Sequence, residues 1–169
     1  MSRAVLSIGS NIGDSLAHLQ GVVDGLREWI VAVSPVYATA PWGGVEQQDF
    51  LNATLIVDDP RTDCRGWLRR GQQLEADADR VREQRWGPRT LDVDVVTCDG
   101  ISSDDPELTL PHPRAHERAF VLVPWLDVDP DATLAVDGGV DERVDALLAR
   151  LDADERAGVR RTTLRLELR

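Results

Sequence analysis

Apolar and polar positions along this chain follow two periods, one typical of strands and one typical of helices. Short runs rich in apolar and β-branched residues predict strands over residues 4–8, 31–39, 50–57 and 91–97. Apolar residues three or four apart predict helices over about 15–30, 59–78, 115–127 and 141–151. Asp59-Pro60 is a typical helix entry, and Pro124 should disturb the third helix. The alternating tail over 159–168 predicts an edge strand.

The first six elements follow the order strand, helix, strand, strand, helix, strand. This order is that of the ferredoxin-like, split β-α-β arrangement, in which an antiparallel sheet carries both helices on one face. The later helices would then cover part of the other face. The 169 residues, without a repeat or a linker, predict one α+β domain over 1–169, an antiparallel sheet in a three-layer α/β/α arrangement.

Three connections deserve separate interpretation. The Gly-rich segment 9–14 lacks the Walker lysine and the G-x-G-x-x-G spacing, so we interpret it as a tight turn in which Asp14 caps the next helix. Residues 40–48 form a loop longer than hairpins need, which makes it a candidate functional loop. Residues 99–105 read as a polar turn. His112 then lies between two prolines, and such a histidine is usually structural unless phosphates lie within reach.

Composition excludes several classes of function. A net charge of −11 disfavours binding to nucleic acids, and no apolar run approaches the length of a membrane span. The N-terminus lacks a signal-peptide pattern, so we expect a cytoplasmic protein. Cys64 and Cys98 show neither metal-ligand spacing nor a disulfide framework, and we interpret both as small core residues.

Two carboxylates and a group of arginines lie together near the middle of the chain. Asp92 and Asp94 project from one face of a predicted strand, with their β-carbons about 7 Å apart. Such a pair suits Mg²⁺, although a bare D-x-D is more often a solvated edge strand. Four arginines precede the pair, at 80, 82, 85 and 89. They could form a surface salt-bridge network, but arginines beside a metal are also what phosphoryl transfer requires.

The strand over 50–57 offers a second candidate surface. Phe50 and Asn52 share one of its faces, so an aromatic ring lies beside an amide that can both donate and accept hydrogen bonds. Taken alone, the pair would be a core phenylalanine and a solvent-facing asparagine.

These motifs resemble the family of 6-hydroxymethyl-7,8-dihydropterin pyrophosphokinases. The resemblance is strongest over residues 85–96 and extends to residues 8–11, 49–53 and 111–114. It implies a folate-pathway enzyme that transfers pyrophosphate from ATP to the hydroxymethyl group of the pterin and releases AMP. It also implies two Mg²⁺ ions, ATP as co-substrate, no nucleic-acid or membrane partner, and action as a monomer.

The resemblance also implies a role for particular residues. Asp92 and Asp94 would bind the two Mg²⁺ ions, and Arg80 and Arg89 would assist the transfer. The nucleotide side would comprise Leu68, Gln72, Arg82, Arg85, Val95, Leu108, Thr109, His112 and Arg118. The pterin side would comprise Thr39, Pro41, Trp42, Phe50, Asn52, Trp86 and Phe120. No residue stands out as a general base.

Two other classes of function stay open at the level of sequence. A ferredoxin-like module that binds a small ligand without chemistry would fit the same topology. It has no need for paired acids beside four arginines. An RNA-binding sheet fits poorly, because the chain has few aromatic residues and an acidic surface.

Overall fold

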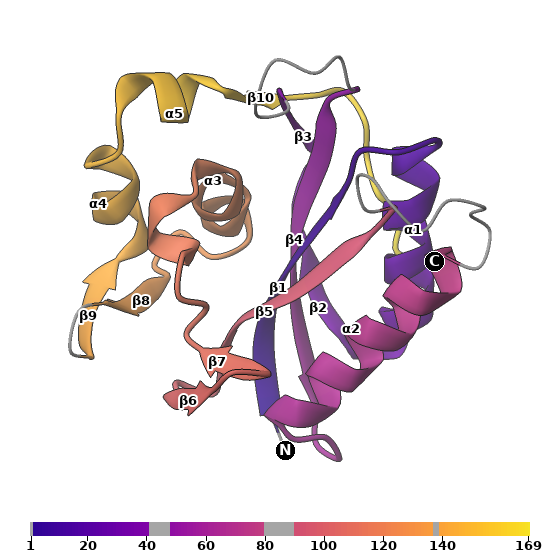
Figure 1. Cartoon of the computed structure of the whole chain (residues 1–169), viewed down its shortest axis with the longest axis horizontal. Helices are drawn as coiled ribbons and strands as arrows, with labels where there is room; N and C mark the ends of the chain where they lie inside the picture. Colours follow the sequence, from indigo (N-terminus) through magenta and orange to yellow (C-terminus); the bar gives the residue numbers. More distant parts are fainter. Residues whose placement is uncertain (1, 41–47, 80–89, 137–138) are drawn as a thin grey trace.

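An antiparallel sheet forms the centre of the protein (Figure 1). The computed structural model describes residues 2–40, 48–79, 90–136 and 139–169. The strands lie in the order β10-β3-β4-β1-β5, and β2 also pairs with β4. Their bounds are β1 Ser2–Ser10, β2 Ile30–Val33, β3 Tyr37–Thr39, β4 Phe50–Asp59, β5 Asp92–Cys98 and β10 Val159–Arg161. The β5-β1-β4-β3 order is that of the split β-α-β arrangement, so the ferredoxin-like prediction is confirmed.

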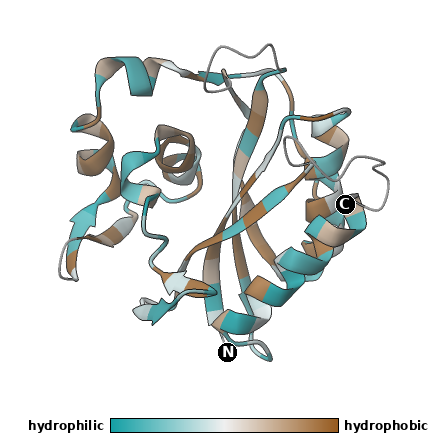
Figure 2. Ribbon diagram, in the orientation of Figure 1, coloured by the Kyte–Doolittle hydropathy of each residue, from teal (hydrophilic) through white to brown (hydrophobic). Residues whose placement is uncertain are grey.

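Two helices, α1 Ser15–Leu26 and α2 Cys64–Asp79, cover one face of this sheet (Figure 1). The Asp14 carboxylate accepts a hydrogen bond from the amide of Ala17, so the predicted cap of α1 is confirmed. Apolar residues on alternate positions of β1, β4 and β5 pack against both helices and form the main core. Much of the outward side of α2 is hydrophilic (Figure 2), as expected for a helix with one buried stripe.

A second layer of helices lies on the other side of the sheet (Figure 1), which confirms the three-layer arrangement. Its core contains Leu122, Trp125 and Leu134 together with Val96 of β5. The predicted disturbance at Pro124 is wrong, because α3 runs without a break from Ala119 to Val128 with Pro124 inside it. The elements of this layer are the 3-10 turn Ala115–Glu117, α3 Ala119–Val128, α4 Val144–Ala149, α5 Ala153–Ala157 and the hairpin of β8 Thr133–Val136 with β9 Val140–Arg143. A further hairpin, β6 Ser103–Asp105 with β7 Leu108–Leu110, lies beside β5, and Leu108 and Leu110 belong to the main core.

Several predicted boundaries were wrong. The first helix ends at Leu26 and is followed by the 3-10 turn Arg27–Trp29. The strand predicted over 31–39 is two strands separated at residues 34–36, where Pro35 interrupts the ladder. The polar turn predicted over 99–105 contains β6, and residues 141–143 belong to β9 rather than to the last helix. In the predicted tail strand over 159–168, only Val159–Arg161 pairs with β3.

The second helix begins later than the Asp59-Pro60 signal predicts, because three interactions hold Asp59 at the end of β4. It pairs with Ser2 of β1, accepts from the amide of Arg61 and forms an ion pair with Arg70 at 2.8 Å. The helix therefore starts at Cys64, where the Asp63 carboxylate accepts from the amide of Gly66 at 2.8 Å.

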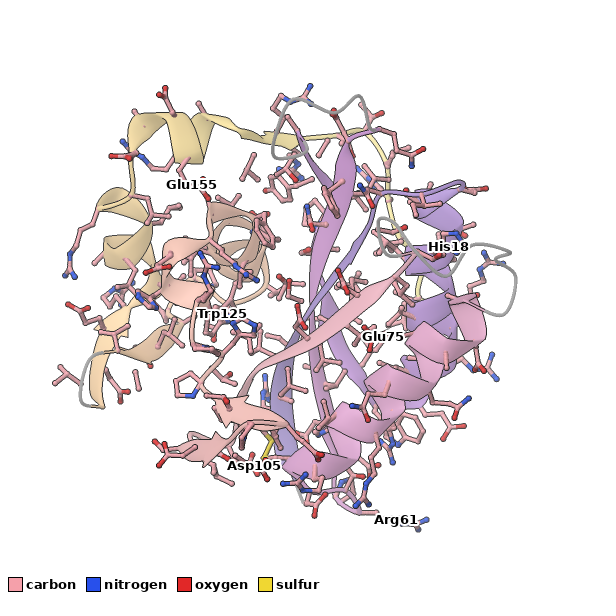
Figure 3. The ribbon with its side chains drawn as sticks, in the orientation of Figure 1. His18, Arg61, Glu75, Asp105, Trp125 and Glu155 are labelled. Atoms are coloured by element: carbon pink, nitrogen blue, oxygen red, sulfur yellow. A yellow bond between two sulfur atoms is a disulfide. The ribbon has the colours of Figure 1, made fainter. Side chains whose placement is uncertain are left out.

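Cys64 and Cys98 form a disulfide, which corrects the expectation of two separate core cysteines. Both residues are buried, as predicted, but they lie 34 residues apart, and no local spacing indicates that they pair. The bond joins the first residue of α2 to the last residue of β5, and Figure 3 draws it in yellow near Asp105. Within the described part of the chain, no helix is long and apolar enough to span a membrane.

Candidate active site

The sheet face that looks away from α1 and α2 carries most of the polar residues of the candidate site. The strand pairing places Asn52 opposite Gly9 and Gly9 opposite Asp92, so these three residues form one row across β4, β1 and β5. Asp94 lies in the next row, opposite Ser7. Because neighbouring strands are spaced by about 4.8 Å, the backbones of Asn52 and Asp92 are about 10 Å apart. Both aspartates are partly exposed on this face.

Asn52 occupies the middle of this face in a fixed orientation. Its side chain is 4% exposed, and its amide nitrogen donates to the Thr39 hydroxyl at 3.1 Å. A β-carbon at Gly9 would meet Asn52 Oδ1 at 2.7 Å, so the amide group lies against the bare backbone of β1. Thr39 pairs with Phe50, and alternation places both on the same face as Asn52.

Helix α3 brings a second aromatic residue to this side of the sheet. Phe120 lies in its first turn and is partly buried, and the Arg118 guanidinium stands 5.6 Å from the centre of its ring. Tyr37 connects β3 to α3, because its hydroxyl donates to the Asp127 carboxylate. The two predicted walls of the pterin side are therefore tied to each other by a buried tyrosine.

A cavity of about 260 Å³ lies along the outer edge of β5. Residues from α2, from β5 and from the segment after β6 form its walls, and they are Leu68, Val93, Asp94, Val95, Pro106, Glu107, Leu108, Thr109, His112 and Pro113. Five of the residues expected on the nucleotide side are among them: Leu68, Val95, Leu108, Thr109 and His112. Gln72 is exposed on α2 and does not line this cavity.

His112 and Asp94 lie on the same side of this cavity. The backbone amide of His112 donates to the carbonyl of Val96 at 2.8 Å, which fixes the histidine beside β5. Burial lowers the pKa of the imidazole below its usual 6.5, while the negative charge of Asp94 acts in the opposite direction. The positive charges of Arg118 and Arg114 lower this pKa further. Burial therefore favours the neutral form of the imidazole, which can donate one hydrogen bond.

Another cavity, of about 320 Å³, lies between β1 and the end of α3. Trp125, labelled in Figure 3, lines it together with Arg3 and Asp129. It contains none of the residues expected at the site, and we assign the chemistry to the β5 side instead.

Three chain segments meet at the end of the sheet where Asn52 and Asp92 lie. The Gln48 side chain donates to the carbonyl of Gly13 at 3.2 Å and to the Ser15 hydroxyl at 2.8 Å. The Ser10 hydroxyl donates to the carbonyl of Thr90. Seven of the expected site residues lie outside the described residues: Pro41, Trp42, Arg80, Arg82, Arg85, Trp86 and Arg89.

Sequence reasoning missed two features of this site. Gly9 was interpreted as part of a tight turn, but it lies inside β1, where a glycine commonly marks a close approach. The apolar run over residues 4–8 could have been extended to include Gly9 in the strand. The link from Tyr37 to Asp127 had no sequence signal, because it depends on where α3 docks.

The chain was compared with models of known protein families. The family model of 7,8-dihydro-6-hydroxymethylpterin-pyrophosphokinase (HPPK) matches residues 5–130. The chain belongs to the HPPK family. The matched range contains every site residue named above, whereas residues 131–169, with the β8–β9 hairpin and β10, lie outside it.

Relatives of the HPPK family cover almost the whole chain. The 2-amino-4-hydroxy-6-hydroxymethyldihydropteridine pyrophosphokinase of Mycobacterium leprae is 58% identical over 179 residues, which is 100% of this chain and 93% of the relative. The enzyme of the same name from Mycobacterium tuberculosis is 53% identical over 169 residues, which is 95% of this chain and 89% of the relative. The enzyme of the same name from Pseudomonas aeruginosa is 35% identical over 138 residues, which is 79% of this chain and 85% of the relative.

Solved structures of HPPK-DHPS proteins share the fold. A triple mutant from Plasmodium falciparum with pteroate superposes with a TM-score of 0.69 at 13% identity, covering 95% of this chain and 46% of that chain. The wild-type protein with pteroate gives a TM-score of 0.64 at 13% identity, covering 86% of this chain and 43% of that chain. This chain therefore spans less than half of those proteins, and the likeness concerns the fold alone.

Proposed function

We propose that this protein transfers the pyrophosphoryl group of Mg-ATP to the hydroxymethyl group of 6-hydroxymethyl-7,8-dihydropterin and releases AMP. Membership of the HPPK family supports this activity, which belongs to tetrahydrofolate biosynthesis. The sheet face described above provides two neighbouring subsites for it. A non-catalytic binding module is not favoured, because the closely similar relatives carry the name of the enzyme.

The pterin would bind between β4 and α3. Phe50 and Phe120 would lie against the two faces of the flat ring, and Asn52 would hydrogen-bond its edge. Thr39 supports this role, because its hydroxyl already holds one end of the Asn52 amide at 3.1 Å. Pro41, Trp42 and Trp86 would complete the enclosure of the ring.

ATP would bind along β5 in the cavity of about 260 Å³. Its apolar walls, formed by Leu68, Val95 and Leu108, suit adenine and ribose, while His112 offers an imidazole N–H to a phosphate oxygen. Arg118 would add a guanidinium contact to the phosphates. Gln72, Arg82 and Arg85 would complete the nucleotide contacts.

Asp92 and Asp94 would hold two Mg²⁺ ions, which fits the chemistry of these side chains. Mg²⁺ prefers one or two carboxylates together with phosphate oxygens and water, and both aspartates are partly exposed on the substrate side of β5. When bound, the ions would neutralise charge on the phosphates and orient them. Arg80 and Arg89 would add positive charge to the transferred group.

The row formed by Asn52, Gly9 and Asp92 is the observation that carries this proposal. In this row Asn52, which would bind the pterin edge, and Asp92 of the acid pair lie about two strand spacings apart, on the side where Asp94 lines the cavity beside β5. A hydroxyl extending from the ring can then approach the β-phosphorus in line with the leaving AMP oxygen. A bond to that phosphorus forms as its bond to the AMP oxygen breaks, and the proton of the hydroxyl is released to solvent, so positioning accounts for most of the catalysis.

Product analysis tests the proposal directly. Incubation with Mg-ATP and the hydroxymethyl pterin should yield AMP and a pyrophosphorylated pterin, and formation of ADP would reject pyrophosphoryl transfer. Asp92→Asn and Asp94→Asn should each lower kcat by about a thousandfold. Asp58→Asn is the matched control, because Asp58 is also a partly exposed aspartate on a strand but lies at the far end of β4.

We also propose that one domain and one chain suffice for activity, because the described site residues lie on elements that pack together, namely β3, β4 and β5 of the sheet and α3 beside it. Sedimentation at the assay concentration should give a single species of 18.7 kDa.

A further inference from the structure

The C-terminal segment lies outside the matched family range yet runs along the strands that carry the pterin side. We define residues 159–167 as the C-terminal strap. Its first part is β10, which pairs with β3 so that Val159 is opposite Thr39 and Arg160 is opposite Ala38. Thr39 is the residue whose hydroxyl holds the Asn52 amide.

Three further attachments hold the C-terminal strap on the molecule. The Thr162 amide and hydroxyl both donate to the carbonyl of Val36, at 3.1 and 2.8 Å. Gln20 of α1 and Glu167 exchange two hydrogen bonds, at 2.7 and 2.8 Å. Leu166 packs against the main core between these two points. The segment is therefore fastened along β3 and again on α1.

Arg160 links the strap to the residue that precedes β4. Its guanidinium lies 2.6 Å from the Asp49 carboxylate, and Asp49 directly precedes Phe50. Because β10 and β4 are the two neighbours of β3, the Arg160 side chain must cross β3 to make this ion pair. The register places Arg160 and Ala38 on the face opposite to Phe50 and Asn52. The contact therefore supports the pterin face from behind and touches no substrate.

We propose that the C-terminal strap, through the ion pair of Arg160 with Asp49, positions the start of β4 for pterin binding. This inference rests on the proposed function, and it assigns Arg160 as a positioning residue. Both side chains are partly exposed, 60% for Arg160 and 43% for Asp49, so the ion pair should have a modest effect. Its location next to Phe50 directs that effect to one substrate.

The test compares Arg160→Ala with Arg150→Ala in the full-length protein. Arg150 forms an ion pair with Glu142 at 2.8 Å and is also 60% exposed, but it lies on the α4 side, away from the site. Arg160→Ala should raise the KM for the pterin about threefold and leave the KM for ATP unchanged. Arg160→Lys should raise the KM for the pterin much less than Arg160→Ala does. The charge swap Arg160→Glu with Asp49→Arg should give an intermediate KM for the pterin.

A merely structural role would give a different pattern. Loss of folded protein would lower kcat without changing the ratio of the two KM values. Equal changes in both KM values, or the same change in Arg150→Ala, would overturn the proposal.

A measurement without substrate separates this inference from the proposed function. Backbone amides of residues 50–52 should exchange with deuterium faster in Arg160→Ala than in the unmodified protein or in Arg150→Ala. Unchanged exchange would overturn the positioning role even if the enzyme forms AMP. Faster exchange in a protein that forms no AMP would leave the role of the strap standing and reject the proposed activity.

Discussion

The Asn52 side chain lies against Gly9 so closely that a β-carbon at Gly9 would come within 2.7 Å of Asn52 Oδ1. The two residues are paired across β1 and β4, and Gly9 is in turn paired with Asp92. A residue without a side chain thus separates the amide from the acid pair. The space above Gly9 is part of the proposed path between the pterin and the phosphates.

Gly9→Ala should therefore impair pterin binding more than folding. The added methyl group would displace the Asn52 amide, which is buried and held by Thr39, and the KM for the pterin should rise about tenfold. The KM for ATP should change little. In an Asn52→Ala background the same substitution should have almost no further effect, and additive losses in this double-mutant cycle would contradict the mechanism.

Tyr37 should titrate at an unusually high pH. Burial, followed by the hydrogen bond to Asp127 and the charge of that carboxylate, raises its pKa from 10.0 to about 12, while Arg161 acts in the opposite direction. Tyr37 is the only tyrosine of the chain, so the ultraviolet absorbance of the phenolate reports this residue alone. Asp127→Asn should move the midpoint toward 10.0. A midpoint near 10.0 in the folded, unmodified protein would refute the assignment.

The same shift predicts how stability depends on pH. Between 10.0 and about 12 the folded protein keeps a proton that the unfolded chain has lost. The contribution of Tyr37 is therefore complete below pH 10.0 and is lost as the pH rises to about 12. Tyr37→Phe should flatten the decline of the unfolding free energy in this window, as measured by urea titration at several pH values.

The Cys64–Cys98 disulfide should contribute strongly to stability. It joins two residues 34 positions apart and closes a segment that contains all of α2 and β5, and loop-closure entropy alone predicts about 3–4 kcal/mol. A reductant should lower the unfolding free energy by about that amount in urea titrations. The double variant Cys64→Ala with Cys98→Ala serves as the control, because reductant should not affect it. An unmodified protein that is insensitive to reductant would exclude this role.

The sequence was sufficient where local patterns decide the structure. Alternation predicted that Asp92 and Asp94 share a face, and the Asp14 cap and the order of the first six elements were also correct. Local signals failed where distant residues compete for the same group. The helix signal at Asp59-Pro60 was overridden because Ser2 pairs with Asp59 and extends β4. Residues 140–143 follow their hairpin partner β8 instead of the helical period.

The sequence predicted which residues belong to the site, but not which residues they contact. The sequence and its resemblance supplied Asn52 and His112, and the structure places each beside a residue that no local pattern could pair with it. Asn52 lies on Gly9 because of the strand register, and His112 lies near Asp94 because its amide bonds to β5. These contacts depend on how separate segments pack, which periodicity does not encode.

Replacement by alanine should change the free energy of unfolding in opposite directions at two helical glycines, Gly21 and Gly71. A β-carbon at Gly71 of α2 would meet Val93 Cγ1 at 3.0 Å and Val93 Cβ at 3.2 Å, whereas one at Gly21 of α1 would meet nothing within 4 Å. Gly21→Ala should therefore stabilise the protein by about 0.5–1 kcal/mol through helix propensity. Gly71→Ala should destabilise it by about 1–2 kcal/mol, because the branched Val93 side chain on β5 has little freedom to move.

Gly71→Ala should also affect the nucleotide side. Val93 of β5 and Leu68 of α2 both line the cavity beside β5, so moving α2 away from β5 should raise the KM for ATP several-fold and leave the KM for the pterin nearly unchanged. Urea unfolding and steady-state kinetics of both variants provide the measurement. If Gly71→Ala were as stabilising as Gly21→Ala, α2 and β5 would not be in the close contact on which the cavity depends.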